Sequence, residues 1–348
     1  MHADLSVVVP VLDEADELPR LLDELASQSL PLQIVIADGG SRDRSREIVE
    51  RSERALWVQA PRGRGAQMNA GAAAAIAENL LFLHVDSHLM HRCQLEQALQ
   101  SLEAARRRHG GCIAGHFALA FRRQQAGGDS AYRYMEAKSR SGRPGTINGD
   151  QGLLLSADFF RELGGFDTRL PFFEDQKMAA EIFRRGRWLL LPGVLGTSAR
   201  RFETEGLAPR YALMALMTWM HQIGLEDFLQ QAVGVYREQS TTHALDLRPF
   251  VRLARRQLLQ ALSRQPGLVE RIGRSLRANA WQPWLALDLL TGRPVDSGTL
   301  RWFTDHAEPR LHGAGGRRLS RALARLLLLG LRLPLERVLP AGRSVQSR

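Results

Sequence analysis

The chain has 348 residues, of which 44% are hydrophobic and 24% are charged, as in globular proteins with one large domain or two modest ones. Its net charge is +10, and arginine carries nearly all of the positive charge because Lys138 and Lys177 are the only lysines. This balance favours partners with phosphate groups or an anionic surface, or it reflects a compositional bias toward arginine. Cys93 and Cys112 are too few for a disulfide framework, and no apolar stretch reaches the roughly 18 residues of a membrane span.

The first ninety residues predict buried strands that alternate with helices. Residues 5–11 form an apolar, largely β-branched run, which is typical of a parallel strand buried on both faces. Further strands are expected at residues 33–38, 56–59 and 80–85, and helices at 18–25, from about 45, and at 67–78. This order predicts an α/β domain of Rossmann-like type, with a mostly parallel central sheet flanked by helices.

Polar residues follow each of these strands directly. In open α/β sheets, ligands bind beyond the carboxyl ends of the strands. The residues at those positions are therefore the first candidates for a site: Asp13 and Glu14, Asp38, residues 62–65, and residues 86–88.

The pattern changes in the second half of the chain. Strands are expected at residues 112–121, 153–155 and 188–191, with an amphipathic helix at 174–185. Beyond about residue 206, helical segments rich in leucine and arginine dominate, at 211–223, 247–262 and 319–331, and residues 313–318 are expected to form a flexible turn. A boundary is expected between residues 205 and 240, and we assign residues 1–225 to the α/β domain and 226–348 to a helical extension.

Eight short motifs in this order resemble the family 2 glycosyltransferases. The resemblance is strongest to the small bacterial "transferase 2" group associated with radical-SAM and selenodomain proteins, and it covers about residues 4–225. It implies the GT-A fold and transfer of a sugar from a nucleotide-diphosphate sugar. The motifs are VVVPVLDE at 7–14, ADGGSRD at 37–43, GRGAQMNAG at 63–71, FLHVDS at 82–87, GDQ at 149–151, GGF at 164–166, ED at 174–175 and TSARR at 197–201.

The resemblance assigns the nucleotide to Asp38 and Arg64. A carboxylate accepts the imide N–H of a uracil-type base, and a guanidinium at a helix start meets a diphosphate. Asp38 alternatively forms an Asx turn, and Arg64 is alternatively a surface charge. A dinucleotide fingerprint is disfavoured because Met68 occupies the position of its third glycine. The same resemblance adds Pro10, Glu14, Asn69, Asp86, Arg200 and Arg201 to the nucleotide-sugar site.

Asp86 and His88 stand where GT-A enzymes place the DxD metal motif. This implies a divalent cation, Mn²⁺ or Mg²⁺, which would bridge the phosphates of the donor. His88 replaces the second acid, and imidazole is an acceptable ligand for manganese. His84, expected inside the preceding strand, is interpreted as a packed core histidine.

The resemblance assigns catalysis to the acidic pair Glu174 and Asp175, with Asp175 as the base, and Glu174 is expected to orient or bind the acceptor. Asp175 would take the proton of the acceptor hydroxyl, giving an inverted product. The alternative is an acid-rich helix start without a catalytic role. Asp150 and Gln151 are expected to line the acceptor side, or to form a turn.

The helical extension carries scattered tryptophans among leucine and arginine. Such a region is typical of peripheral contact with a membrane surface, where lipid-linked acceptors are found, or of packing against the catalytic domain or a second copy of the chain. Nucleic acid is disfavoured because the arginines are dispersed and no binding motif is present. These aromatic and basic positions include Trp219, His221, Trp281, Trp284 and Trp302.

Together these features predict a cytoplasmic glycosyltransferase that uses a UDP- or GDP-type donor and a hydroxyl acceptor. A nucleotidyltransferase of related fold is the first alternative, but such enzymes open with a glycine-rich loop where this chain has residues 11–14 without glycine. A non-catalytic nucleotide-sugar-binding protein is the second, because the metal motif lacks its second acid.

Overall fold

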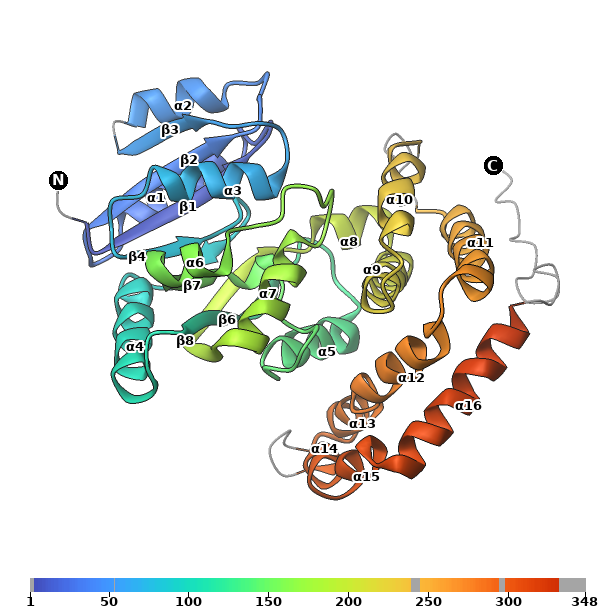
Figure 1. Ribbon diagram of the computed structural model, residues 1–348. Coiled ribbons are helices and arrows are strands. Elements are labelled where there is room, and N and C mark those ends of the chain that lie inside the picture. The colour runs from blue at the N-terminus through green and yellow to red at the C-terminus, as the bar shows by residue number, and fades with distance from the viewer. Residues whose placement is uncertain (1–2, 53, 239–244, 294–297, 332–348) are drawn as a thin grey trace. The chain divides into compact units, whose positions relative to one another are not determined.

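The computed structural model describes residues 3–52, 54–238, 245–293 and 298–331. The chain divides into two compact units, Met1–Thr204 and Glu205–Arg348. The division falls at the start of the range, 205–240, in which composition predicts the boundary. It lies before residue 225, where we assigned the end of the α/β domain, so α9 (Leu207–Gln222) belongs to the second unit. Figure 1 shows the strands of the first unit and the helices of the second.

The first unit contains an eight-stranded mixed sheet in the order β3-β2-β1-β4-β7-β6-β8-β5. Strands β3, β2, β1 and β4 are parallel neighbours, as are β6 and β8, while β7 and β5 pair antiparallel to their neighbours. The strands are β1 (Leu5–Val11), β2 (Leu32–Asp38), β3 (Ala55–Gln59), β4 (Asn79–Phe82), β5 (His88–Leu89), β6 (Ile113–Arg122), β7 (Leu153–Ser156) and β8 (Arg187–Ser198).

Apolar side chains cover both faces of this sheet. Val7 and Val9 belong to one buried cluster and Val8 to another, because successive side chains of a strand point to opposite faces. Leucines of α1 and α4 complete the first cluster, and side chains of α3, α6 and α7 complete the second. The helices of this unit are α1 (Leu18–Ala26), α2 (Ser45–Ser52), α3 (Arg64–Ala73), α4 (Gln94–His109), α5 (Asp129–Ser139), α6 (Ala157–Leu163), α7 (Glu174–Arg185) and α8 (Arg200–Glu205), with a 3₁₀ turn η1 (Gly149–Gln151).

This arrangement confirms the predicted α/β fold class: a mostly parallel mixed sheet flanked by helices, with a helical C-terminal region. Three predicted elements differ in extent. The helix expected at 67–78 begins earlier, at Arg64, and ends at Ala73. The strand expected at 80–85 is β4, which ends at Phe82 because its neighbour β7 begins opposite it at Leu153. β8 is twelve residues long instead of four.

The second unit is helical throughout its described residues (Figure 1). Residues 313–318, expected to be a flexible turn, instead lead into α16, which begins at Ala314 directly after Gly313. The helices that follow α9 are α10 (Glu226–Glu238), α11 (Arg248–Arg264), α12 (Leu268–Ala278), α13 (Gln282–Thr291), α14 (Thr299–Trp302), a π-helical turn η2 (Phe303–Ala307), α15 (Glu308–His312) and α16 (Ala314–Gly330).

The tryptophans of this unit are largely packed within it. Trp281 is almost fully buried, and Trp284 stacks on Phe303 and lies beside Trp302. Trp302 is the exposed one of these three. None of the helices in the described part of the chain is long and apolar enough to cross a bilayer.

Candidate active site

Charged side chains from three elements and from the loop after β4 meet beyond the end of that strand. Because β4 stops at Phe82, His84 lies beyond the strand, where its Nδ1 is 2.8 Å from Oδ1 of Asp150 in η1. Its Nε2 is 3.4 Å from a guanidinium nitrogen of Arg64, the first residue of α3. The interpretation of His84 as a packed core histidine is therefore wrong: its ring joins an acid and an arginine.

Arg64 also pairs with Glu174 at the start of α7. The guanidinium Nε lies 2.5 Å from Glu174 Oε1, and the glutamate side chain is only 2% exposed whereas that of Arg64 is 40% exposed. Gly65 makes this approach feasible, since a Cβ there would lie 3.3 Å from the carbonyl oxygen of Asp167 and 3.5 Å from Cβ of Glu174. Glu174 is thus buried, and it is the partly exposed Arg64 that reaches the surface of the site.

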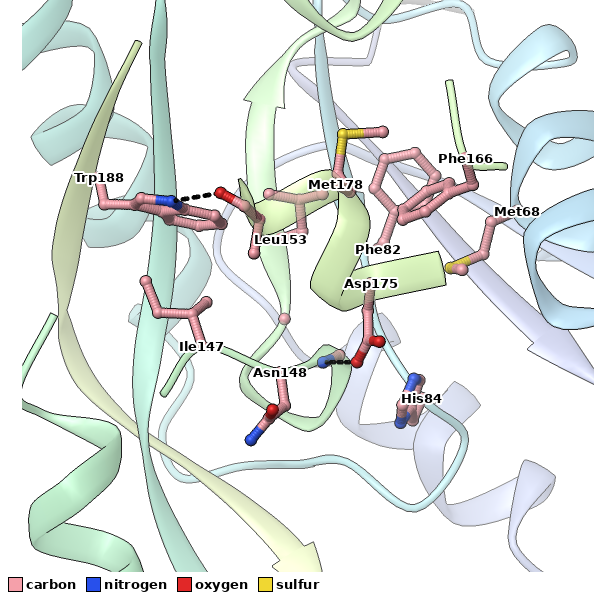
Figure 2. Close-up of a pocket in the computed structure, with 13 residues that line it drawn as sticks. Met68, Phe82, His84, Ile147, Asn148, Leu153, Phe166, Asp175, Met178 and Trp188 are labelled. Carbon is pink, nitrogen blue, oxygen red and sulfur yellow. Dashed lines mark hydrogen bonds between the residues drawn. The ribbon is translucent and has the colours of Figure 1, made fainter. Parts of the chain in front are cut away.

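Asp175 is held next to this ion pair by two backbone donors. Its Oδ2 accepts a hydrogen bond of 2.7 Å from the N–H of Gly149, and its Oδ1 accepts one of 2.7 Å from the N–H of Gln176. Gly149 leaves no room for a larger residue, because a Cβ there would be 2.8 Å from Nε2 of His84 and 3.2 Å from Oδ2 of Asp175. Asp175 and His84 are therefore neighbours across Gly149 (Figure 2).

These contacts, together with burial, shift the pKa values of Asp150, His84 and Glu174. Partial burial disfavours a charge on Asp150, but the hydrogen bond from His84 and the charges of His84, Arg64 and Arg201 together lower the pKa of Asp150 to about 2. Burial also works against a charged His84, yet Asp150 raises the pKa of that imidazole. For Glu174, burial raises the pKa although Arg64 opposes the shift. The site therefore holds its acids in different environments, as catalytic sites do.

A second group lies next to the first, after β1 and at the start of α8. Burial raises the pKa of Glu14, the negative charge of Asp86 adds to the shift, and Arg200 and Arg201 oppose it. Asp86 also acts on the pKa of His84, and Arg201 on that of Asp150. Glu14, Asp86, Arg200 and Arg201 are therefore within electrostatic reach of the network around Arg64.

Arg20 of α1 fixes the loop that carries Asp86. Its guanidinium donates to the carbonyl oxygens of Val85 at 2.9 Å and Ser87 at 2.8 Å, and it pairs with Glu17 and Glu24 on its own helix. Sequence reasoning missed this residue. Its only sequence signal is one arginine among the acids and leucines of residues 13–25.

The predicted metal ligands differ in their surroundings. Asp86 forms no hydrogen bond or ion pair with the described residues, so its carboxylate is open to a hard cation. The Nδ1 of His88 lies 3.2 Å from Oε1 of Glu24 instead, which leaves only Nε2 for a metal. Over the described ranges, three or more acids, histidines or cysteines nowhere gather as metal ligands. The residues fit a cation held by Asp86 together with oxygens of the donor.

Asp38 ends β2, two strands away from β4, and is 97% removed from solvent. Its Oδ2 accepts from the N–H of Gly40 and its Oδ1 from that of Ser41, each at 2.9 Å. The carboxylate thus shapes its own turn, as the Asx alternative describes. Gln67 of α3 braces this turn, because its Nε2 donates to the carbonyl oxygens of Val11 and Ala37. Sequence reasoning missed Gln67 although it lies in the GRGAQMNAG motif.

Three other predicted site residues have no side-chain polar group left for a ligand, because two form hydrogen bonds within the protein and the third is a proline. The amide of Asn69 bonds both the N–H and the carbonyl of Phe166, each at 2.9 Å, and so ties α3 to the Gly164–Phe166 turn. Gln151 is fully buried, and its amide bonds the ring of His116 and the carbonyl of Thr146. Pro10 lies within β1, paired with Ala37, and has no side-chain polar group.

An apolar cavity of about 30 Å³ lies behind Asp175 and His84 (Figure 2). This is about the space of one water molecule, so the cavity does not hold a sugar. Its wall is apolar and makes the surroundings of the Asp175 carboxylate less polar. The apolar lining side chains include Met68, Phe82, Ile147, Leu153, Phe166, Met178 and Trp188.

Residues 6–151 match the sequence model of Glycosyl transferase family 2. This part of the chain, somewhat less than half of its length, is similar to the family 2 glycosyl transferases. The match ends at Gln151, so Glu174, Asp175, Arg200 and Arg201 lie outside the matched range.

Two curated relatives resemble short stretches of the chain. One is the 4,4'-diaponeurosporenoate glycosyltransferase of Staphylococcus haemolyticus, 26% identical over 32% of this chain and 31% of that protein. The other is the succinoglycan biosynthesis protein ExoA of Rhizobium meliloti, 35% identical over 24% of this chain and 27% of that protein. The chain thus spans about a third or less of the length of these relatives.

Solved structures that are similar to this chain include two complexes with a nucleotide or nucleotide sugar. The mannosyltransferase PcManGT from Pyrobaculum calidifontis, in complex with GDP-Man and Mn²⁺, is 16% identical with a TM-score of 0.49 over 96% of this chain and 89% of that chain. Residues 1–349 of TarS from S. aureus in complex with UDP are 16% identical with a TM-score of 0.45, over 87% of this chain and 91% of that chain.

Proposed function

We propose that this protein transfers a sugar, with inversion, from a nucleotide-diphosphate sugar of the UDP or GDP type to a hydroxyl acceptor. The observation that carries the proposal is the network beyond the end of β4, which joins Arg64 of α3, His84 of the loop after β4, Asp150 of η1, and Glu174 and Asp175 of α7. The match of residues 6–151 to the sequence model of the family 2 glycosyl transferases supports it. On the motifs quoted above, we place the chain in the bacterial group associated with radical-SAM and selenodomain proteins.

Asp175 is proposed as the general base. Two backbone N–H groups fix its carboxylate, and apolar side chains line the cavity beside it. A carboxylate so positioned takes a proton efficiently when the acceptor hydroxyl lies within hydrogen-bond reach. Glu174, buried and paired with Arg64, orients that arginine instead of acting on the substrate itself.

The proposed step breaks one bond and forms another at the anomeric carbon. The acceptor oxygen attacks that carbon, its proton passes to Asp175, and the bond to the diphosphate breaks so that the nucleoside diphosphate leaves with the electron pair. Arg200 and Arg201 at the start of α8, with Arg64, offset the charge that builds on the leaving phosphate. Asp38 is proposed to contact the base, although its two oxygens already accept from Gly40 and Ser41.

Asp86 is the residue proposed to hold a divalent cation, Mn²⁺ or Mg²⁺, with Nε2 of His88 as a further ligand. Such a cation would supply Lewis-acid stabilisation of the departing diphosphate. The open carboxylate of Asp86 supports this role, and Arg20 fixes the loop that presents it. Burial raises the pKa of Glu14, and the negative charge of nearby Asp86 adds to the shift, as expected where acids share a site.

The acceptor is proposed to be a hydroxyl compound, lipid-linked, bound on the side of Asp150. Asp150 is 45% exposed and so accessible to such a ligand, whereas Gln151 would act only by holding η1 in place. The free, exposed Cys93 and Cys112 support a reducing, cytoplasmic location.

Release of nucleoside diphosphate from a panel of UDP- and GDP-sugars tests the proposal. We expect release with at least one donor, an increase with Mn²⁺ or Mg²⁺, and a strong decrease in Asp86→Asn. Asp16→Asn, at a neighbouring surface acid of residues 13–17, is the control and should leave the rate unchanged. A chain that binds a nucleotide sugar without turning it over, with or without metal, would instead be a non-catalytic binding protein.

A further inference from the structure

Helix α16 presents an apolar face that nothing in the described part of the chain covers. Five of its leucines are exposed, among them Leu323 at 48% and Leu326 at 63%. At about 100° per residue, Leu319, Leu323 and Leu326 fall within about 60° of one another. Leu327 lies about 40° beyond Leu323, and the four residues Leu319, Leu323, Leu326 and Leu327 form what we call the leucine face.

The same helix carries an arginine face and no acidic residue. Arg318, Arg321 and Arg325 also fall within about 60° of one another, about 150° away from the leucine face. All are exposed, and within the described ranges Arg318 and Arg325 form no ion pair. Arg321 lies 3.7 Å from Glu270.

A third face fixes the helix against α12. Ser320, Ala324 and Leu328 are buried. Ser320 packs closely on Gly273 of α12, since a Cβ added at Gly273 would lie 3.3 Å from the Oγ of Ser320. Arg277 of α12 donates to the hydroxyl of Ser320. With this third face used for packing, the leucine and arginine faces are left for a partner.

The charge around α16 is strongly one-sided. Residues 1–204 contain 26 basic and 26 acidic residues, which cancel, whereas residues 205–348 contain 21 basic and 11 acidic residues. The whole net charge of +10 therefore resides in the second unit, and the four arginines of α16 contribute without a compensating acid on that helix.

From this geometry we infer that α16 lies on the surface of an anionic lipid bilayer. A helix with leucines on one side and arginines on the other buries its apolar face at the headgroup boundary while the arginines meet lipid phosphates. A second copy of this chain is a poorer occupant, because pairing two such helices brings arginines of like charge together. The inference does not depend on the proposed sugar transfer.

Vesicle sedimentation of the full chain tests it. We use vesicles of phosphatidylcholine alone and vesicles with about a third phosphatidylglycerol, at about 0.1 M and about 0.5 M NaCl. We expect binding to the anionic vesicles that is at least tenfold stronger than to the neutral ones and that weakens with salt. Arg318→Gln with Arg325→Gln should weaken it roughly thirtyfold, since each arginine near such a surface contributes about a factor of five.

The leucine face is tested by Leu323→Gln with Leu326→Gln, which keeps helix propensity high. We expect at least a tenfold loss of binding, while Leu56→Gln, at an equally exposed leucine of β3, changes nothing. Circular dichroism confirms that the variants are folded. Equal binding to both vesicle types, or binding to neither, would overturn the inference. So would sedimentation velocity that shows a dimer of the original protein and a monomer of the Leu323→Gln, Leu326→Gln variant.

Discussion

The two units of this chain distribute their charge in opposite ways. The first is neutral over residues 1–204 and gathers its charges into pairs at one edge of the sheet, as in Arg64 with Glu174 and His84 with Asp150. The second holds the whole excess of +10 and leaves arginines of α16 on its surface. Paired charges next to buried groups are suited to chemistry, whereas an unpaired basic face is suited to a large anionic surface.

Replacing Asp175 with Asn should produce the largest effect and sharpen the role of the first unit. If this carboxylate is the base, kcat falls roughly 10³-fold, since general-base catalysis contributes about 10² to 10⁴. Donor affinity should remain unchanged by calorimetry. Asp158→Asn, at an exposed acid of α6, is the control, and an Asp175 variant with normal turnover would remove the proposed base.

Replacing Arg64 with Ala tests whether the charges of the first unit depend on their pairing. Glu174 would remain buried without its partner, and we expect a loss of about 2 to 3 kcal/mol in the free energy of unfolding, less than for a fully buried pair because Arg64 is 40% exposed. The pKa of Glu174, already raised by burial, should rise further. A group with a raised folded-state pKa stabilises at low pH, so the variant should regain stability as the pH falls below that pKa.

Denaturant unfolding across pH measures both effects of Arg64→Ala. Arg62→Ala, just before the helix, is the matched control and should stay within about 0.5 kcal/mol of the original protein. An Arg64→Ala protein of unchanged stability at every pH would contradict a structural ion pair at this position.

The pair of Asp150 and His84 should contribute less to the free energy of unfolding than the pair of Arg64 and Glu174, and its contribution should depend on pH. The pKa of Asp150 is about 2 against an ordinary 3.8, so its stabilisation is present above pH 3.8 and is lost as the pH falls toward 2. The raised pKa of His84 gives a contribution that is present at low pH and lost as the pH rises through that value. Allowing for the 45% exposure of Asp150, Asp150→Asn should cost about 1 kcal/mol near pH 5.

An NMR titration of His84 measures the same pair directly. Its pKa should fall in Asp150→Asn, because the hydrogen bond and the negative charge that raise it are removed. His91, in the loop before α4, serves as an internal reference whose titration should not move. A His84 titration that is identical in both proteins would show that the pair does not form.

The smallest expected effect lies in the second unit. Leu326→Gln should change the free energy of unfolding by less than about 0.5 kcal/mol, since the side chain is 63% exposed and its loss opens no cavity. Leu328 lies on the face of α16 that packs against α12. Leu328→Gln should therefore lower the free energy of unfolding several times more than Leu326→Gln does. Equal losses in the two variants would mean that the leucine face is packed in solution.

The sequence predicted the first half of the fold well because its signals are local. Residues 5–11 and 33–38 are apolar runs ended by polar residues, and β1 and β2 follow them within a residue. The ends of β4 and β8 were missed, because strand length depends on the partner strand. His84 was misread for this reason: an apolar run through Val85 predicts a strand, whereas pairing with β7 stops at Phe82.

The candidate site could be predicted in its acids but not in its connections. Asp86, Asp150 and Asp175 stand out next to glycines or at element ends. Their partners could not be read from the chain, since the His84–Asp150 contact spans 66 residues and the Arg64–Glu174 contact spans 110. Arg20 and Gln67, which hold the loops in place through backbone carbonyl oxygens, carry no motif that distinguishes them from surface residues.

Hydrogen–deuterium exchange with a bound nucleoside diphosphate and Mn²⁺ tests most directly where the donor binds. We expect slower exchange in residues 13–15, 84–88, 149–151 and 174–176, which surround the paired charges of the first unit, and no change in α16. Protection confined to residues 205–331, or absent from the ends of β1 and β4 while UDP or GDP is shown to be bound, would contradict this account.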